Sequence, residues 1–171
     1  MALNETLWTA LLGAVTLVFL IGFWLLPGGV LALRRLALGE LQVDVRLGYS
    51  PDTLYRILRL YGPDGIRSFR YMLLVDMVFP AVYGTLFFLL GDLAAVAHPG
   101  ALWPGIVRVM AITAAGFDYL ENMLLIFVLR HLPARQVGAA RAAGICTSLK
   151  MLSFAVALGS LATTLLTCAV R

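Results

Sequence analysis

"MAITAAGFDYLENMLLIFVL", residues 110–129, is long and apolar enough to cross a lipid bilayer as a helix. Its interior nevertheless carries Asp118, Glu121 and Asn122, and their three- and four-residue spacing places them on one helix face. A charged side chain at the centre of a membrane helix costs about 2.5–3.5 kcal/mol. We therefore expect this face to point into a helical bundle, where the polar groups find partners.

The composition of the whole chain agrees with a membrane protein. Of its 171 residues, 61% are hydrophobic and 13% are charged, whereas about a quarter of the residues in a soluble domain are charged. Apolar stretches predict four membrane spans, at about 7–33, 68–91, 102–129 and 142–170. The predicted fold is an all-α integral membrane protein, a four-transmembrane-helix bundle forming a single domain over residues 1–171.

Arginines are concentrated in the connections between spans one and two and between spans three and four. The positive-inside rule places both connections in the cytoplasm, so both termini are predicted to lie outside it. The Ala-, Leu- and Arg-rich composition suggests a bacterial plasma (inner) membrane. We read the pI near 9.4 as contact between the loops and anionic membrane lipids, and we expect no nucleic-acid partner.

The cytoplasmic segment 34–67 is predicted to contain two structured parts. "LQVDVRL", residues 41–47, alternates apolar and polar residues, which is typical of an extended segment. Next, Ser50 and Pro51 predict a helix start and Gly62 a helix end. The apolar stripe of this short amphipathic helix predicts that it lies on the membrane surface, either as a simple connection or as a lid over a cavity; the stripe is Leu54, Ile57, Leu58 and Tyr61.

Three predicted spans place ionisable groups at a similar depth. At about 1.5 Å per residue, these groups lie roughly 10–18 Å from the cytoplasmic ends of their helices. The predicted polar layer consists of Asp76, Asp118, Glu121, Asn122 and Lys150, with Tyr83 deeper. We expect Lys150 to pair with Glu121 or Asp76. The surplus acids would then be protonated, bind a cation or contact water.

Other polar residues have simpler interpretations. Asp92 and Arg108 are expected to form a salt bridge near the outer ends of spans two and three, and Pro80 is expected to kink span two close to Asp76. The two cysteines, Cys146 and Cys168, are too far apart on one predicted helix to pair. No spacing of Cys or His predicts a metal site.

Arginines at the cytoplasmic mouth have two interpretations. They either flank the spans in the ordinary way, or they hold the phosphate of a lipid substrate with Mg²⁺ bound to the acids below. These arginines are Arg67, Arg70, Arg130 and Arg141.

Three functions remain open from the sequence. The first is an enzyme acting on a lipophilic substrate, such as an isoprenoid or other lipid, by carboxylate acid/base or cation-stabilising chemistry. Its candidate catalytic residues are Asp76, Asp118, Glu121 and Lys150, and its candidate substrate-binding residues are Tyr83, Asn122, Arg67 and Arg70. The second is a non-catalytic subunit or scaffold whose polar layer only packs helices. The third is a proton-coupled transporter, which at this size would need a homo-oligomer.

Overall fold

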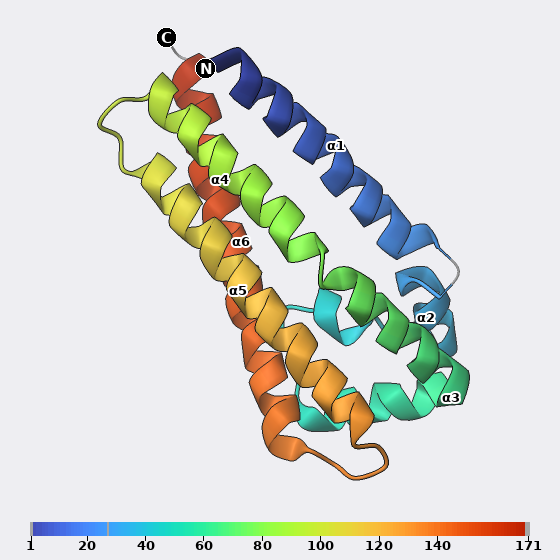
Figure 1. The fold of residues 1–171 in the computed structure, drawn as a ribbon. Helices are drawn as coiled ribbons and strands as arrows, with labels where there is room; N and C mark the ends of the chain where they lie inside the picture. The colour runs from blue at the N-terminus through green and yellow to red at the C-terminus, as the bar shows by residue number, and fades with distance from the viewer. Residues whose placement is uncertain (1, 27, 170–171) are drawn as a thin grey trace.

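The computed structural model describes residues 2–26 and 28–169, and these residues form helices and no strands (Figure 1). Five of the described helices have 19 or more residues, and a seven-residue helix and a 3-10 turn lie between the first two of them. In chain order the elements are α1 (Ala2–Leu25), α2 (Val30–Leu36), a 3-10 turn (Val43–Val45), α3 (Pro51–Asp76), α4 (Phe79–Ala97), α5 (Trp103–Arg130) and α6 (Val137–Ala169).

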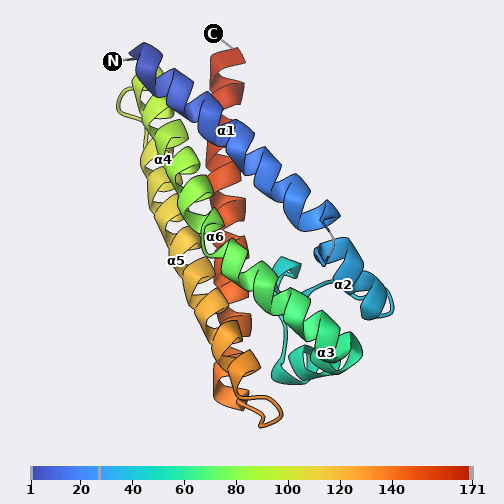
Figure 2. The ribbon, with the colours of Figure 1, turned by 45° about the vertical axis from the view of Figure 1, so that its right-hand side comes forward.

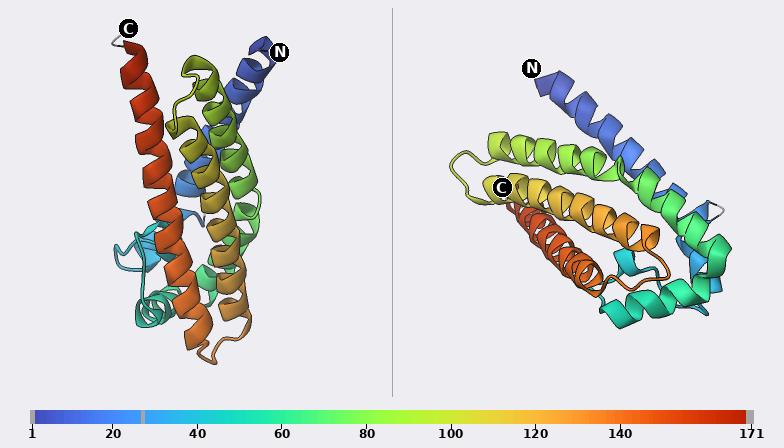
Figure 3. Two further views of the ribbon diagram at one scale, coloured as in Figure 1. Left: turned by 90° about the vertical axis from the view of Figure 1, so that its left-hand side faces the viewer. Right: turned by 60° about the horizontal axis from the view of Figure 1, so that its bottom comes forward.

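Four of the long helices pack in the order α1, α4, α5 and α6, each against the next. α4, α5 and α6 run alongside one another, and α1 packs chiefly on α4 (Figure 3). Both termini lie at one end of the bundle, while the α5–α6 turn and the first half of α3 lie at the other (Figure 1). Four stretches are long and apolar enough to span a membrane: Thr6–Leu36, Pro51–Ala97, Trp103–Arg130 and Val137–Thr164.

The first two predicted spans are each interrupted. The predicted first span, 7–33, corresponds to the candidate span Thr6–Leu36. Its helix is interrupted, because α1 ends at Leu25 and the chain turns through Gly28, whose φ of +84° suits glycine, before α2 begins. In the second span, α3 ends at Asp76 and α4 begins at Phe79. Pro80 lies in the first turn of α4, where its missing N–H costs no helical bond. The expected interruption next to Asp76 is confirmed.

The helix predicted from Ser50 is present, and its apolar stripe faces protein. The Ser50 side chain accepts a hydrogen bond from the Thr53 amide at 3.2 Å, and Gly62, with φ +62°, interrupts α3. The stripe is buried against α5 and α6, which corrects the expectation that it lies on the membrane surface. The stripe belongs to the buried core cluster, which includes from α5 and α6 the residues Leu125, Val128, Leu129, Ala140 and Ala143.

The prediction of an extended segment at 41–47 is wrong. Val43–Val45 form a 3-10 turn, and Leu47 is 83% exposed while Gln42 is only 1% exposed. The turn buries Gln42, whose side chain hydrogen-bonds Asp44 within the same segment, and the backbone carbonyl of Asp44 accepts from Lys150 on α6. This segment consequently belongs to the site.

Candidate functional site

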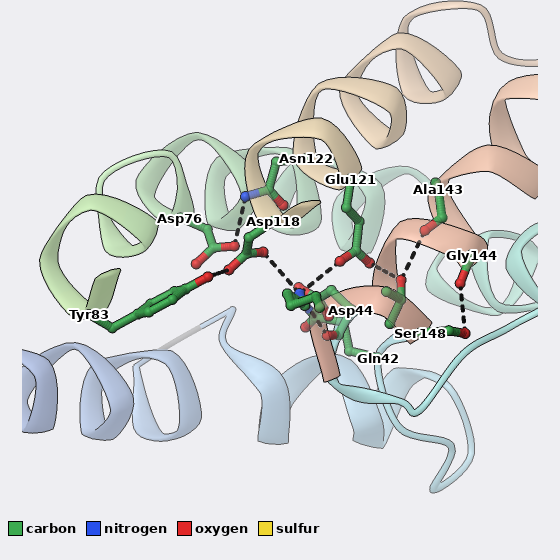
Figure 4. Close-up of polar contacts among 12 residues, drawn as sticks. Gln42, Asp44, Asp76, Tyr83, Asp118, Glu121, Asn122, Ala143, Gly144 and Ser148 are labelled. Atoms are coloured by element: carbon green, nitrogen blue, oxygen red, sulfur yellow. Dashed lines mark hydrogen bonds and ion pairs between the residues drawn. The ribbon is translucent and has the colours of Figure 1, made fainter. Parts of the chain in front are cut away.

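Lys150, on α6, is the centre of the buried polar layer, in which Asp44, Asp118 and Glu121 lie close together (Figure 4). Its Nζ lies 2.9 Å from Asp118 Oδ1 and 2.7 Å from Glu121 Oε2, and it donates to the backbone carbonyl of Asp44 at 3.3 Å. The contacts with Asp118 and with the Asp44 carbonyl are hydrogen bonds, and the contact with Glu121 is an ion pair. The expected Lys150–Glu121 pair is confirmed, and Asp118 takes the place proposed for Asp76.

Glu121 faces away from solvent and joins α5 to α6. Its side chain is fully buried, and the Thr147 hydroxyl lies 2.5 Å from its Oε1. Both carboxylate oxygens are therefore held by residues of α6, Thr147 and Lys150. This arrangement suits a structural ion pair between two helices.

Asp118 connects α5 to α4 as well as to α6. The Tyr83 hydroxyl, on α4, donates to Asp118 Oδ2 at 3.0 Å. The Tyr83 ring is held by aromatic neighbours, with ring centroids 5.1 Å from Phe79 and 4.8 Å from Phe154. Tyr83 therefore presents its hydroxyl in a fixed direction.

Asp76 is in a different situation from the other acids. Its Oδ2 accepts a hydrogen bond from Asn122 Nδ2 at 2.8 Å, and no cationic partner for it is found among residues 2–26 and 28–169. Asp76 lies at the break between α3 and α4 and is partly buried. It is thus the carboxylate of the predicted layer with the most freedom to contact a ligand.

The structure adds Gln42 and Asp44, which the sequence prediction missed. Gln42 Nε2 donates to Asp44 Oδ2 at 2.7 Å, an assignment that follows because an ionised carboxylate can only accept. Gln42 Oε1 and Asp44 Oδ1 are buried and have no hydrogen-bond partner in the described part of the chain. Burial raises the pKa of Asp44, and the nearby Lys150 charge opposes this rise. The signal in the sequence was a lone acid between valines in a connection close to a span.

The polar layer forms one wall of a cavity of about 330 Å³. Ligand-binding cavities commonly have volumes of about 300–1,000 Å³, so this one suits a small or slender molecule. The polar wall consists of Gln42, Asp44, Asp76, Tyr83, Asp118 and Lys150. The rest is largely apolar and comes mainly from α1, α4 and α6, including Leu20, Phe23, Trp24, Phe79, Phe87, Met151, Phe154 and Leu158.

The exposed part of the cavity lining comes from α1 and α6. Three of its lining side chains are substantially exposed: Leu20 at 43%, Trp24 at 39% and Leu158 at 55%. An apolar rim on the side of a bundle suits entry from a lipid phase better than entry from water.

The arginines predicted for substrate binding lie away from this cavity. Arg67 is exposed, 3.7 Å from Asp64, and Arg70 donates to the backbone carbonyl of Leu129 at 3.2 Å. Arg141 lines a separate open groove near the starts of α3 and α6. The structure therefore does not bring these arginines together with the acids.

The other expectations concern metals, cysteines and the outer salt bridge. No group of three or more His, Cys, Asp or Glu side chains able to hold a metal is found among the described residues, so the geometry gives no support to the Mg²⁺ interpretation. Asp92 and Arg108 form the expected salt bridge at 2.9 Å. Cys146 is a buried free thiol, and the side chain of Cys168 lies outside the described part.

Comparison of this chain with models of protein families, with curated proteins and with solved structures found no match.

Proposed function

We propose that the chain is a multi-pass protein of a bacterial inner membrane that acts as an enzyme on a lipophilic substrate. Both termini lie outside the cytoplasm, and the substrate enters the cavity sideways from the bilayer. The observation that carries the proposal is the cavity itself, which joins an apolar wall to a carboxylate, Asp76, with no cationic partner among the described residues. A lipophilic substrate would bring its reactive polar end to that carboxylate.

In this proposal the residues of the polar layer have separate tasks. Asp76 is the general acid/base or the group that stabilises a developing cation, and Asn122 orients it through the 2.8 Å hydrogen bond. Asp118, Lys150 and Glu121 form a fixed framework. That framework sets the electrostatic field around Asp76 and holds α5 and α6 in register.

A scaffold that uses the polar layer only to pack helices is the competing proposal. It accounts well for Glu121, Thr147 and Lys150, which are buried and mutually bonded. It gives no reason for a cavity that ends on Asp76, because a packing network is most stable when it is filled and fully paired. The cavity therefore favours the enzyme.

The test compares lipid extracts of cells producing the wild-type protein, Asp76→Asn or the matched control Asp64→Asn. Asp64 is exposed and remote from the cavity. Untargeted mass spectrometry should find one lipophilic compound consumed and another formed with wild type and Asp64→Asn, but not with Asp76→Asn. All three proteins should be recovered folded in equal amounts. Unchanged extracts for wild type would reject the enzyme, and misfolding of Asp76→Asn alone would favour the scaffold.

A further inference from the structure

The polar wall of the cavity has more hydrogen-bond acceptors than donors. Lys150 donates to Asp118 and to the Asp44 carbonyl and forms an ion pair with Glu121. The Tyr83 hydroxyl donates to Asp118, and a Gln42 amide hydrogen is donated to Asp44. Two oxygens remain, Gln42 Oε1 and Asp44 Oδ1, both buried and without a partner in the described part of the chain. A third unpartnered buried oxygen, Asn122 Oδ1, lies in the same layer.

The unpartnered oxygen of Gln42 is an observation independent of the acidic cluster. Gln42 is 1% exposed and lines the cavity, although it lies in an irregular connection whose polar residues would normally face water. Burying a polar oxygen without a hydrogen bond is unfavourable. A ligand that donates hydrogen bonds in the cavity would offset that cost.

The charges at this wall are also unbalanced. Asp44, Asp76 and Asp118 line the cavity, and Lys150 is the cation that lines it with them. Glu121, behind the wall, shares that same lysine. Buried charges without a counter-charge are strongly unfavourable, so the site favours a positively charged occupant.

We infer that the cavity binds a cationic amphiphile, an aliphatic ammonium whose charged end lies among Asp44, Asp76 and Gln42 Oε1. This inference rests on the ligand-binding cavity of the proposed function. An ammonium supplies the missing donors and the missing positive charge together, while its hydrocarbon chain lies along the aromatic wall formed by residues such as Phe87 and Phe154. A fatty acid or lipid phosphate would add acceptors and negative charge where both are already in excess. The Thr16 hydroxyl, also in the lining and unpartnered among the described residues, can donate or accept a hydrogen bond. It therefore does not distinguish a cationic ligand from an anionic one.

The experiment compares three probes with the same chain, dodecylamine, dodecanol and dodecanoic acid. The full-length protein is placed in phosphatidylcholine nanodiscs, with Trp8 and Trp103 replaced by Phe so that the fluorescence of cavity-lining Trp24 reports binding. Dodecylamine should bind at least about tenfold more tightly than dodecanol, because a charge-assisted hydrogen bond contributes about 1.5–3 kcal/mol. Dodecanoic acid should bind more weakly than dodecanol.

Substitutions in the wall then identify the charges responsible. Asp44→Asn and Asp76→Asn should each weaken dodecylamine binding about tenfold and leave dodecanol binding unchanged, whereas the remote control Asp64→Asn should change neither. Equal affinity of the wild type for amine and alcohol would overturn the inference even if a variant fails to fold. Equal losses for both probes in the variants would overturn it as well.

The two proposals fail separately. Preferred binding of dodecylamine together with unchanged cell lipid extracts would keep the cationic ligand and reject the enzyme. Turnover of an uncharged lipid that depends on Asp76, together with no preference for the amine, would keep the enzyme and reject the cationic ligand.

Discussion

At the scale of single residues, Lys150 supplies the positive charge that pairs with two of the buried acids, Asp118 and Glu121. It contacts α5 through Asp118 and Glu121 and the 37–50 connection through the Asp44 carbonyl. Removing one partner of a buried ion pair costs about 3–5 kcal/mol, since the other charge is left uncompensated. Lys150 therefore acts as a structural cation for three segments of the chain.

Asp44 gives a pH-dependent prediction. Burial raises its pKa from the ordinary value of 3.8, Lys150 opposes the rise and Asp118 adds to it. The stability linked to this carboxyl is therefore fully present below the unfolded-state pKa and is lost as pH rises through the folded-state pKa. Asp44→Asn removes that loss, so its melting temperature relative to wild type should be higher at pH 8 than at pH 4.

The measurement is thermal unfolding of both proteins in nanodiscs across that range. The carboxamide introduced by Asp44→Asn can still accept the Gln42 hydrogen bond, so the comparison isolates the charge. A difference in melting temperature that is constant with pH, or that is largest in acid, would contradict the raised pKa.

The residues of the layer were predictable where they interrupt apolar helices. Asp76, Asp118, Glu121 and Lys150 stand out in otherwise apolar spans, and helical spacing gives their depth. Which acid pairs with Lys150 was not predictable, because it depends on how the helices rotate against one another. Asp44 was missed because period-two alternation reports local geometry and carries no information about a contact with a lysine far along the chain.

At the scale of elements, the 37–50 connection is held against α6 at a glycine. A Cβ added to Gly144 would collide with the backbone oxygen of Tyr49, and a Cβ on Gly48 would collide with the Ser148 hydroxyl. The small residue Gly144 therefore lets an irregular segment approach α6 closely. That contact keeps Asp44 and Gln42 inside the bundle.

Gly144→Val should push this connection off α6. Overpacking of this kind costs about 1–3 kcal/mol, so the variant should melt at a lower temperature. It should also lose dodecylamine affinity, because Asp44 and Gln42 move out of the wall. Gly159→Ala is the matched control on the same helix, since its Cβ meets no atom within 4 Å. Unchanged amine binding by Gly144→Val would show that the connection is not part of the binding wall.

The long helices were predictable to different degrees. α5 and α6 follow the predicted third and fourth spans, because uninterrupted apolar sequence is a strong signal for a helix. The helix breaks after Leu25 and after Asp76 were harder to predict, since glycine and proline mark where a helix can break and the packing of neighbouring helices decides whether it does. The amphipathic stripe of α3 was found, and its orientation toward α5 and α6 was not.

At the scale of the whole molecule, the arrangement of the ends predicts a topology. Both termini lie at one end and the α5–α6 turn at the other (Figure 1). In a background with Cys146 and Cys168 replaced by Ala, a membrane-impermeant maleimide added to intact cells should label Asn4→Cys. It should label Ala134→Cys, in the α5–α6 turn, only after lysis. The reverse pattern would invert the proposed orientation, and labelling of both sites in intact cells would reject four spans.

The proposed function depends on the cavity that is lined by side chains of α1, α4 and α6. Of these helices, α1 packs chiefly on α4 (Figures 2 and 3). Neither the cavity nor its opening could be predicted from sequence, since both depend on which helix pairs pack and which do not.

The central claim is that the polar layer has a structural half around Lys150 and a ligand-facing half at Asp76. The most direct test is the melting temperature of Asp76→Asn and of Lys150→Met, each in nanodiscs beside wild type. The carboxamide oxygen introduced by Asp76→Asn can still accept the Asn122 hydrogen bond, so this variant should melt close to wild type. Lys150→Met leaves Asp118 and Glu121 without their cation and should melt several degrees lower. An equal fall in both variants would contradict the division and make Asp76 part of the packing network.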